Sequence, residues 1–351
     1  MSPGSWVCRA SVSSPASRIP RRNDLVPRLD RYWQTVNPVA LLLSPLALLF
    51  AAVAGLRRAA YRAGVLRVAR FPVPVLVVGN ITVGGTGKTP LVIWLARYLR
   101  GQGWQPGIVS RGYGGRARHW PQQVRPDSDP ASVGDEAVML AAATTCPMCV
   151  GPDRPAAVQA LLEHTDIDIV ISDDGLQHYA LGRDLEIAVI DGERRFGNRL
   201  PLPAGPLREP ISRLRRVDMV VVNGQGGAGE FSMKLHQPVL HALQGDAQTR
   251  LAEFSGQRVH ALAGIGNPQR FFDLLDRMGL DVDPHPFPDH HRFRDKDLCF
   301  EDGAPVLMTE KDAVKCRRLP CRNCWVVRID AQPDAAFVHR LSTALKDIVD
   351  G

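Results

Sequence analysis

A glycine-rich segment, residues 77–90, constrains this chain more than any other part of its sequence. It reads VVGNITVGGTGKTP, follows an apolar run and precedes residues 88–99, where apolar side chains recur at helical spacing. Glycines let consecutive backbone N–H groups turn inward, and such groups at the start of a helix bind phosphate. The order of strand, loop and helix therefore predicts a site for a nucleoside triphosphate.

The residue types within this loop have separate expected roles. Lys88 supplies a positive charge for the β- and γ-phosphates, and the Thr89 hydroxyl suits Mg²⁺. The general pattern has glycine where this chain has Thr82, so the match is incomplete, and a plain glycine-rich turn is the alternative. The residues predicted to bind the nucleotide are Thr82, Gly84, Gly85, Thr86, Gly87, Lys88 and Thr89.

Further apolar runs end in polar residues, and segments with helical spacing separate several of them. The runs cover residues 107–110, 167–175, 186–191, 217–224, 258–266, 305–312 and 324–330. This alternation predicts an α/β fold of the P-loop NTPase type, with a mostly parallel sheet and helices on both faces. Ligands bind such sheets at the carboxyl ends of the strands, so the polar residues there are candidates for the site.

Two aspartates end the run at residues 167–175. Asp173 and Asp174 are expected beside the P-loop, where Mg²⁺ needs oxygen ligands. Gln177 and His178 come next, on the loop that leaves the strand, and could reach metal or substrate. Solvated aspartates in a turn before Gly175 are the alternative.

The length of 351 residues and a hydrophobic content of 45% predict a large core and two domains. We expect a membrane-associated helical segment over residues 28–70, a P-loop core domain over 71–255 and a smaller C-terminal α/β subdomain over 256–351. Residues 1–27, rich in Ser, Pro and Arg, are expected to be a disordered tail or to result from an over-extended start.

Positive charge is concentrated near the N-terminus. Residues 1–70 hold eleven arginines and two aspartates, a net charge of +9, whereas the whole chain carries +7 and the remainder therefore −2. A body of this charge is not expected to bind nucleic acid.

The basic region surrounds residues 36–56, an apolar stretch without any charge. At 1.5 Å per residue it is just long enough to span a bilayer, although Pro45 interrupts it. A membrane anchor that spans the bilayer or lies in its interface is favoured, with arginines against anionic headgroups. A signal peptide is disfavoured for two reasons. The stretch is not followed by a small-residue cleavage site and a disulfide-rich body, and the nucleotide site further along the chain needs cytosolic ATP. A buried core helix is the remaining alternative.

Two C-x-x-C pairs, Cys146 with Cys149 and Cys321 with Cys324, could in principle ligate zinc together with Cys316. The pairs lie far apart in the sequence, and each is beside a strand-like run. Reduced structural thiols are the favoured interpretation.

Eight motifs occur in the order and approximate spacing of one known family. They read VGNITVGGTGKTP, SRGYGG, VGDEAVMLA, DDGLQH, LPAGPLREP, AGIGNPQRFF, FPDHHRF and TEKDAVK. On these motifs the chain resembles the tetraacyldisaccharide 4'-kinases, the lipid A 4'-kinases of Gram-negative bacteria, from about residue 29 to near the C-terminus. Thr82 is the form of the P-loop found in that family.

The resemblance implies a kinase at the cytoplasmic face of the inner membrane of a Gram-negative bacterium. With ATP and Mg²⁺ it would phosphorylate the 4'-hydroxyl of an acylated glucosamine disaccharide 1-phosphate and give lipid IVA. Such an acceptor lies in the bilayer, which agrees with an anchor. Its 1-phosphate gives Arg111 and Arg208 a role as substrate contacts, with His178 beside them. The expected metal ligands are Thr89, Asp173 and Asp174, to which the resemblance adds Gln177 and Glu209.

The attacking hydroxyl also needs a proton acceptor. Asp135 begins a predicted helix directly after a glycine, where capping the helix is its alternative role. His290 could face it across a domain cleft, and the resemblance points to the same two positions. We expect Asp135 to be the catalytic base and His290 to assist it after domain closure, with Lys88 as the third catalytic residue.

Other classes of P-loop protein fit less well. A GTPase needs an N-K-x-D segment, and TEKD at residues 309–312 has its lysine one position off. A transporter ATPase needs an L-S-G-G-Q-like signature, and FSGQR at residues 254–258 lacks the second glycine. A membrane-attached P-loop ATPase or GTPase that acts as a regulatory nucleotide-binding module is the alternative function.

Overall fold

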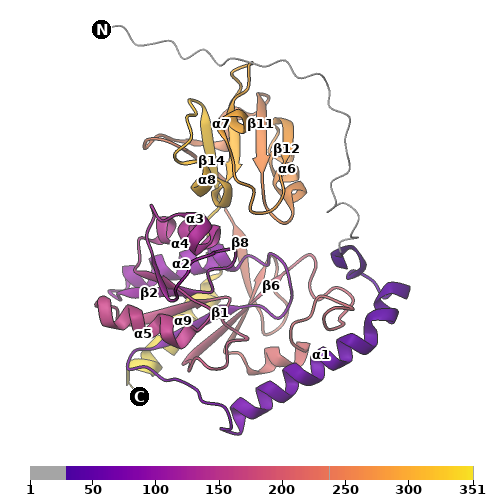
Figure 1. The fold of residues 1–351 in the computed structure, drawn as a ribbon, viewed down its shortest axis with the longest axis vertical. Helices are drawn as coiled ribbons and strands as arrows, with labels where there is room; N and C mark the ends of the chain where they lie inside the picture. Colours follow the sequence, from indigo (N-terminus) through magenta and orange to yellow (C-terminus); the bar gives the residue numbers. More distant parts are fainter. Residues whose placement is uncertain (1–28, 237, 351) are drawn as a thin grey trace.

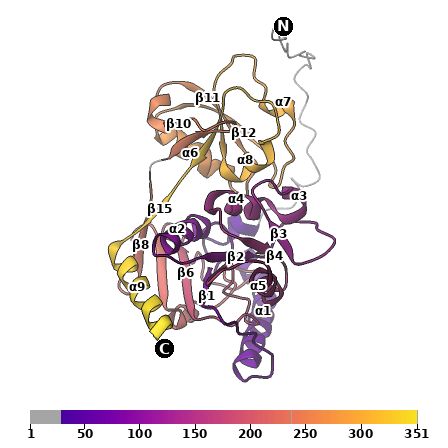
Figure 2. The ribbon, with the colours of Figure 1, turned by 90° about the vertical axis from the view of Figure 1, so that its left-hand side faces the viewer.

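The computed structural model describes residues 29–236 and 238–350 of the chain. They form two units, each built on its own β-sheet, with the smaller unit above the larger one in Figures 1 and 2. A long helix, α1, runs beside the larger unit (Figure 1). The expected N-terminal tail, residues 1–27, lies outside the described residues.

The larger sheet has nine strands in the order β15-β8-β7-β6-β1-β5-β2-β4-β3. Its inner strands are parallel, and the edge pairs β3–β4 and β8–β15 are antiparallel. The predicted mostly parallel sheet is confirmed. The strands are β1 (Val75–Gly79), β2 (Pro106–Ser110), β3 (Gln122–Val124), β4 (Met148–Val150), β5 (Ile169–Asp173), β6 (Leu185–Asp191), β7 (Met219–Asn223), β8 (Phe231–Leu235) and β15 (Ala331–Pro333).

Helices cover both faces of this sheet, as predicted. Leu76 and Val78 of β1 belong to the core beneath α2, α4 and α9, whereas Val75 and Val77 belong to the core beneath α5. Because parallel strands buried on both faces need apolar side chains at every position, they read as continuous apolar runs. The helical segments of this unit are α2 (Lys88–Gly101), α3 (Pro130–Val133), α4 (Asp135–Thr144), α5 (Arg154–His164), α9 (Ala335–Asp350) and the 3-10 helix η3 (Ile211–Arg216).

The smaller sheet has six strands in the order β10-β9-β14-β13-β11-β12. Phe271, Phe272 and Leu275 of α6 pack in the core on one face, and Ala313 and Cys316 of α8 pack in the core on the other. The elements are β9 (Val239–Ala242), β10 (Gln248–Arg250), η4 (Leu251–Phe254), β11 (Arg258–Ala263), α6 (Pro268–Arg277), β12 (Asp281–Pro286), α7 (Asp295–Leu298), β13 (Val306–Thr309), α8 (Glu310–Cys316) and β14 (Cys324–Arg328).

The two sheets divide the chain differently from the predicted boundary between residues 255 and 256. β9 and β10 already belong to the smaller sheet, and β15 returns to the larger one. The helix α9 follows it there, with Phe337 and Leu341 fully buried in the larger core. The boundary is corrected accordingly, because spacing within a short strand does not reveal which sheet it joins.

The predicted apolar segment forms α1 (Pro38–Arg62), which follows the short 3-10 helix η2 (Leu29–Tyr32). By length and composition, α1 is the one helix among the described residues that could cross a membrane. Asn37 caps it by accepting a hydrogen bond from the Ala40 N–H. Most of its leucines are exposed, Leu42 to 80%, so the alternative of a buried core helix does not describe this segment.

One of the two C-x-x-C pairs differs from expectation. Cys321 and Cys324 form a disulfide, so the prediction of reduced thiols is wrong for this pair. The turn before β14 brings their Cα atoms to 5.7 Å, a separation that suits a bridge. Cys146 and Cys149 are free and buried, as expected, and burial raises the pKa of the Cys149 thiol to about 11.

Candidate active site

The parallel pairing of β1 with β5 brings the P-loop and the two aspartates to one edge of the sheet. Val78 of β1 lies opposite Asp173, the last residue of β5. The Gly175 N–H then donates to the Val78 carbonyl at 3.1 Å, which fixes the turn after β5 against the strand that enters the P-loop. This is the edge at which parallel sheets bind their ligands.

The P-loop requires glycine at two positions. Gly84 and Gly87 have φ values of 103° and 92°, a backbone conformation that other residues rarely adopt. A Cβ on Gly87 would also lie 2.8 Å from Asn223 Nδ2, so the Asn223 side chain of β7 would have to move to admit a larger residue. Gly87 precedes α2 and provides no side-chain cap, which leaves the first N–H groups of the helix to bind an anion.

One buried polar side chain and one backbone hydrogen bond brace the loop. The Asn80 Nδ2 donates to the Gly84 carbonyl at 3.4 Å and to the Thr86 hydroxyl at 3.3 Å. The Val83 N–H donates to the Pro206 carbonyl at 2.9 Å, which ties the loop to the segment over residues 200–209. Asn80 was not predicted, although a polar residue directly after an apolar strand was the available signal.

Asp173 is a buried carboxylate with one unused oxygen. Its Oδ2 accepts a hydrogen bond from the Ser110 hydroxyl at 3.2 Å, whereas its Oδ1 is buried and has no hydrogen-bond partner among the residues that the structure describes. Burial, together with the charges of Asp174 and Glu136, raises the pKa of Asp173 to about 6. A desolvated carboxylate oxygen without a donor fits a hard cation such as Mg²⁺.

Asp174, by contrast, lies between two cations. Its oxygens are 3.0 Å from Arg208 and 3.5 Å from the Lys88 ammonium. Burial opposes its ionisation, but Lys88 and Arg208 outweigh this effect and hold the pKa of Asp174 below its usual range. Its φ of 50° is also uncommon for a residue other than glycine. The two aspartates therefore differ, since only Asp174 is neutralised by protein cations.

A cleft of about 1490 Å³ brings most of the predicted site residues together. Phe50 and Val53 of α1 form part of its wall, and Arg270 and Phe271 of α6 face it from the smaller unit. One continuous cleft therefore joins the P-loop to the apolar helix. The predicted residues that line it are Thr82, Gly84, Gly85, Thr86, Gly87, Lys88, Thr89, Arg111, Asp173, Asp174, Gln177, His178, Arg208 and Glu209.

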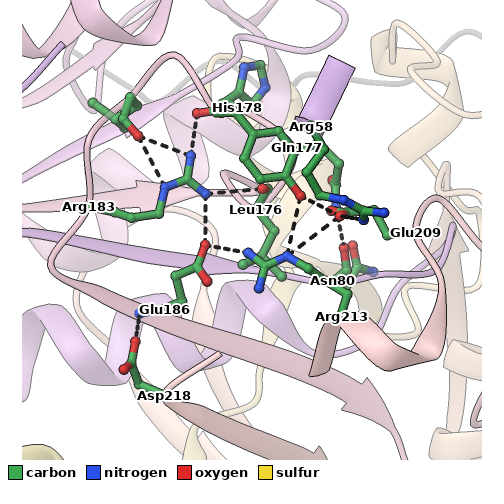
Figure 3. Close-up of polar contacts among 12 residues, drawn as sticks. Arg58, Asn80, Leu176, Gln177, His178, Arg183, Glu186, Glu209, Arg213 and Asp218 are labelled. Carbon is green, nitrogen blue, oxygen red and sulfur yellow. Dashed lines mark hydrogen bonds and ion pairs between the residues drawn. The ribbon is translucent and has the colours of Figure 1, made fainter. Parts of the chain in front are cut away.

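Glu209 lies in a network of polar contacts that joins α1 to the site (Figure 3). Its Oε2 accepts hydrogen bonds from the Tyr179 hydroxyl and, at 3.0 Å, from Arg58 of α1, and its Oε1 accepts one from Gln177 at 2.9 Å. The Arg213 Nε lies 3.6 Å from the Glu209 Oε2. Both carboxylate oxygens already have protein donors, so Glu209 holds α1 in this arrangement, and its role as a metal ligand stays a prediction.

The three expected substrate contacts lie beside the P-loop, on the cleft wall. Burial, with the positive charges of Arg154 and Arg111, lowers the pKa of His178 to about 4, so its imidazole is neutral at pH 7. A neutral imidazole donates one hydrogen bond and accepts another, which suits a sugar hydroxyl. Arg111 is exposed, and Arg208 is paired with Asp174. Their contact with substrate stays a prediction.

Asp135 and His290 meet at the junction of the two units. The His290 Nδ1 lies 3.0 Å from the Asp135 Oδ2, so the predicted contact is confirmed. Gly134 is the residue before α4 and Asp135 is the first helical residue, so the alternative of a helix cap does not apply. Neither member of the pair is part of the described cleft wall, although the neighbouring Glu136 and Asp289 are. Their catalytic role stays a prediction.

Two arginines near the P-loop were not predicted. Arg194 donates to the Gly85 carbonyl and lies 3.0 Å from Asp191, at the end of β6. Arg270 of α6 reaches the same aspartate from the smaller unit at 3.1 Å. Both follow strands and could have been noted in the sequence, but only the fold reveals that they converge. Asp191 thus forms a second contact between the units.

A glycine-rich loop that opens a helix, a lysine at its end and strand-end aspartates define a P-loop nucleotide-binding protein with the charges that phosphoryl transfer needs. The family model of tetraacyldisaccharide-1-P 4'-kinase, LpxK, matches residues 39–346. The chain therefore belongs to the tetraacyldisaccharide-1-P 4'-kinase family.

The sequences of individual relatives match almost the whole of this chain. The tetraacyldisaccharide 4'-kinase of Nitrosococcus oceani is 56% identical over 317 residues, which cover 90% of this chain and 94% of that protein. The corresponding protein of Alkalilimnicola ehrlichii is 55% identical and covers 90% and 96%. A crystal structure of LpxK from Aquifex aeolicus in complex with ATP superposes with a TM-score of 0.76 at 26% identity, covering 88% of this chain and 99% of that one.

The raised pKa of Asp173 predicts a pH dependence of stability in the protein free of metal and nucleotide. The folded state favours the protonated carboxyl, so this stabilisation is complete below about pH 4 and is lost as the pH rises through about 6. Asp173→Asn should remove that loss, worth up to about 3 kcal/mol at pH 7. Thermal unfolding between pH 4 and 8 measures it, with Asp347→Asn on the exposed face of α9 as the control. Parallel curves for wild type and Asp173→Asn would contradict the prediction.

Proposed function

We propose that this chain transfers the γ-phosphoryl group of ATP to the 4'-hydroxyl of a tetraacyldisaccharide 1-phosphate, as the name of its family describes. The observation that carries the proposal is the single cleft that joins the P-loop and the strand-end aspartates to α1. A soluble acceptor would not require an exposed apolar helix beside the nucleotide site. An acylated acceptor does, because its chains stay in an apolar phase while its sugar is phosphorylated.

Nucleotide binding in this proposal uses the P-loop as it stands. Backbone N–H groups of residues 84–89 contact the phosphate oxygens, and Lys88 exchanges its partner Asp174 for the β- and γ-phosphates. Thr89, Asp173 and Asp174 would hold Mg²⁺, which when bound neutralises negative charge on the phosphates. The unpaired Asp173 Oδ1 supports this ligand set. The Aquifex aeolicus relative was crystallised with ATP, which supports ATP as the phosphoryl donor.

The acceptor sugar would lie between the P-loop and α1. Arg111 and Arg208 suit the 1-phosphate, because a guanidinium can form two parallel hydrogen bonds to it. Arg208 would be free to do so where Asp174 serves as a ligand of Mg²⁺. The neutral imidazole of His178 would orient a sugar hydroxyl through hydrogen bonds without placing a further positive charge beside the phosphates.

The proton of the 4'-hydroxyl would pass to the pair of Asp135 and His290. The contact of 3.0 Å lets the carboxylate orient the imidazole, or the imidazole assist the carboxylate, at the moment of transfer. Neither residue lines the cleft, whereas the neighbouring Glu136 and Asp289 do, so a movement of the smaller unit would bring the pair and the acceptor together.

The assay that tests this function combines the purified chain with ATP, Mg²⁺ and detergent-solubilised tetraacyldisaccharide 1-phosphate. Mass spectrometry should detect a second phosphate on the lipid, and Lys88→Ala should abolish it. The alternative, a regulatory nucleotide-binding module, predicts ATP binding or hydrolysis with no phosphorylated lipid. That outcome would contradict the proposed function.

The proposed base is tested separately by Asp135→Asn. The amide keeps the shape of the side chain but cannot accept the proton, so kcat should fall by about 10²-fold or more while the Kd for ATP is unchanged. His290→Ala should reduce kcat somewhat less. Asp127→Asn, an exposed residue of the same unit, is the control. A near-normal kcat for Asp135→Asn would mean that the residue only holds the two units together.

We further propose that α1 attaches the protein to the cytoplasmic face of the inner membrane, where ATP is available. Arg57, Arg58 and Arg62 follow the apolar stretch and suit anionic headgroups, although Arg58 also reaches Glu209. The Gram-negative relatives support the compartment.

Attachment is tested by Leu42→Asp with Leu49→Asp, which replaces two leucines that are 80% and 62% exposed on α1. Each charge should weaken insertion by about 3 kcal/mol, so the protein should move to the soluble fraction in membrane sedimentation at high salt. Binding of ATP should survive, because neither leucine lines the cleft. Val349→Asp, an exposed apolar residue of α9, should leave the distribution unchanged. A double variant that still sediments with membranes would refute α1 as the anchor.

A further inference from the structure

Three metal-ligating side chains gather on one face of the smaller sheet, away from the cleft. β11 and β12 are parallel, and their register places His260 opposite Asp283 and Leu262 opposite His285. Because side chains two residues apart share a face of a strand, His260, Asp283 and His285 lie together. β12 is the edge strand of the sheet, so this cluster lies at its border.

The separations of the ligand atoms are close to those of a metal site. The His260 Nδ1 lies 3.0 Å from the His285 Nε2 and 3.4 Å from the Asp283 Oδ2, and the other Asp283 oxygen lies 3.9 Å from the same His285 nitrogen. A tetrahedral zinc ion with bonds of about 2.0–2.2 Å needs ligand atoms about 3.3–3.6 Å apart. One ligand atom from each residue lies within 4.8 Å of the others, so small side-chain rotations, without a change of backbone, would bring the three atoms to the separations that a shared ion requires.

The surroundings of His260 also resemble those of a metal ligand. Its second nitrogen, Nε2, lies 3.0 Å from an oxygen of Asp302, on the loop after α7. A histidine ligand commonly donates its other ring N–H to a carboxylate, which fixes the ring and directs the free lone pair to the metal. With the proton on Nε2, the same arrangement directs the Nδ1 lone pair of His260 toward His285 and Asp283. Phe300 stacks on the His260 ring at 3.6 Å and shields it from water.

Access and charge permit a cation to enter. His260 is buried, whereas Asp283 and His285 are partly exposed at the sheet edge. Arg258 pairs with Asp283 at 3.1 Å, but this arginine is itself 59% exposed and can move into solvent. The carboxylates of Asp283 and Asp302 offset the charge of the incoming ion.

We propose that His260, Asp283 and His285 bind one Zn²⁺ ion that fastens the edge strand β12 to β11. Two imidazoles and a carboxylate are a borderline ligand set that favours zinc over Mg²⁺ or Ca²⁺. The fourth position would hold water. Since none of the three residues lines the cleft, the ion would stabilise the smaller unit and take no part in phosphoryl transfer.

The test is a Zn²⁺ titration of the full chain in detergent, after chelator treatment, followed by calorimetry. Wild type should bind one equivalent and unfold at a higher temperature when loaded. His285→Gln and Asp283→Asn keep the side-chain size and should each weaken binding by about 100-fold or more. His339→Gln, an exposed histidine of α9, is the matched control and should bind like wild type. Wild-type affinity in both cluster variants would overturn the proposal.

Asp302→Asn and a Co²⁺ spectrum separate this cluster from other binding groups in the chain. Loss of the outer carboxylate should weaken binding about 10- to 100-fold. Co²⁺ in the site should give visible bands of a tetrahedral ion without the near-ultraviolet absorption of a cobalt–thiolate bond. A thiolate band, or unchanged affinity in Asp302→Asn, would assign the ion to the cysteines or to adventitious binding and exclude the cluster. Absence of any stoichiometric binding would leave the cluster as a hydrogen-bonded group only.

Discussion

The pairing of β1 with β5 is the constraint on which the rest of this molecule depends. A phosphate loop can begin only where a strand ends, and a metal carboxylate is useful only within reach of that loop. Parallel strands in register meet both needs at once, since Val78 and Asp173 lie opposite each other. The two neighbouring carboxylates then differ in their surroundings. Lys88 and Arg208 neutralise Asp174, whereas Asp173 has a buried oxygen to which none of the described residues donates a hydrogen bond.

A second chain of contacts connects the membrane-facing helix to the nucleotide loop. Arg58 of α1 holds Glu209, Glu209 accepts from Gln177, and Gln177 donates in turn to the carbonyl of Asn80 at 2.9 Å (Figure 3). Asn80 is the residue that braces the P-loop through Thr86. The position of α1 and the shape of the phosphate loop are therefore linked through partly buried, hydrogen-bonded groups, which have few alternative arrangements.

The sequence predicted those features whose causes lie within a few residues. The P-loop, the strand-end aspartates and the apolar helix are local patterns, and the motifs around Asp135 and His290 led to a contact that is present. Features that depend on tertiary pairing were missed or misjudged. Three such features arise from segments that come together only in the fold. They are the membership of β9 in the smaller sheet and of β15 in the larger one, the disulfide between Cys321 and Cys324, and the convergence of Arg194 and Arg270 on Asp191.

The antiparallel pair of β8 and β15 gives the molecule a particular topology. Leu235 lies opposite Ala331, and the His236 N–H donates to the Asp330 carbonyl at 2.9 Å. The chain therefore leaves the larger sheet and re-enters it at the same place, like a β-hairpin whose loop has grown into an entire folded module. The larger sheet would be continuous without that module, so the P-loop core is complete in itself. The chain enters the module after β8 and leaves it before β15, two adjacent strands of the larger sheet, and this single neck favours swinging of the module over sliding.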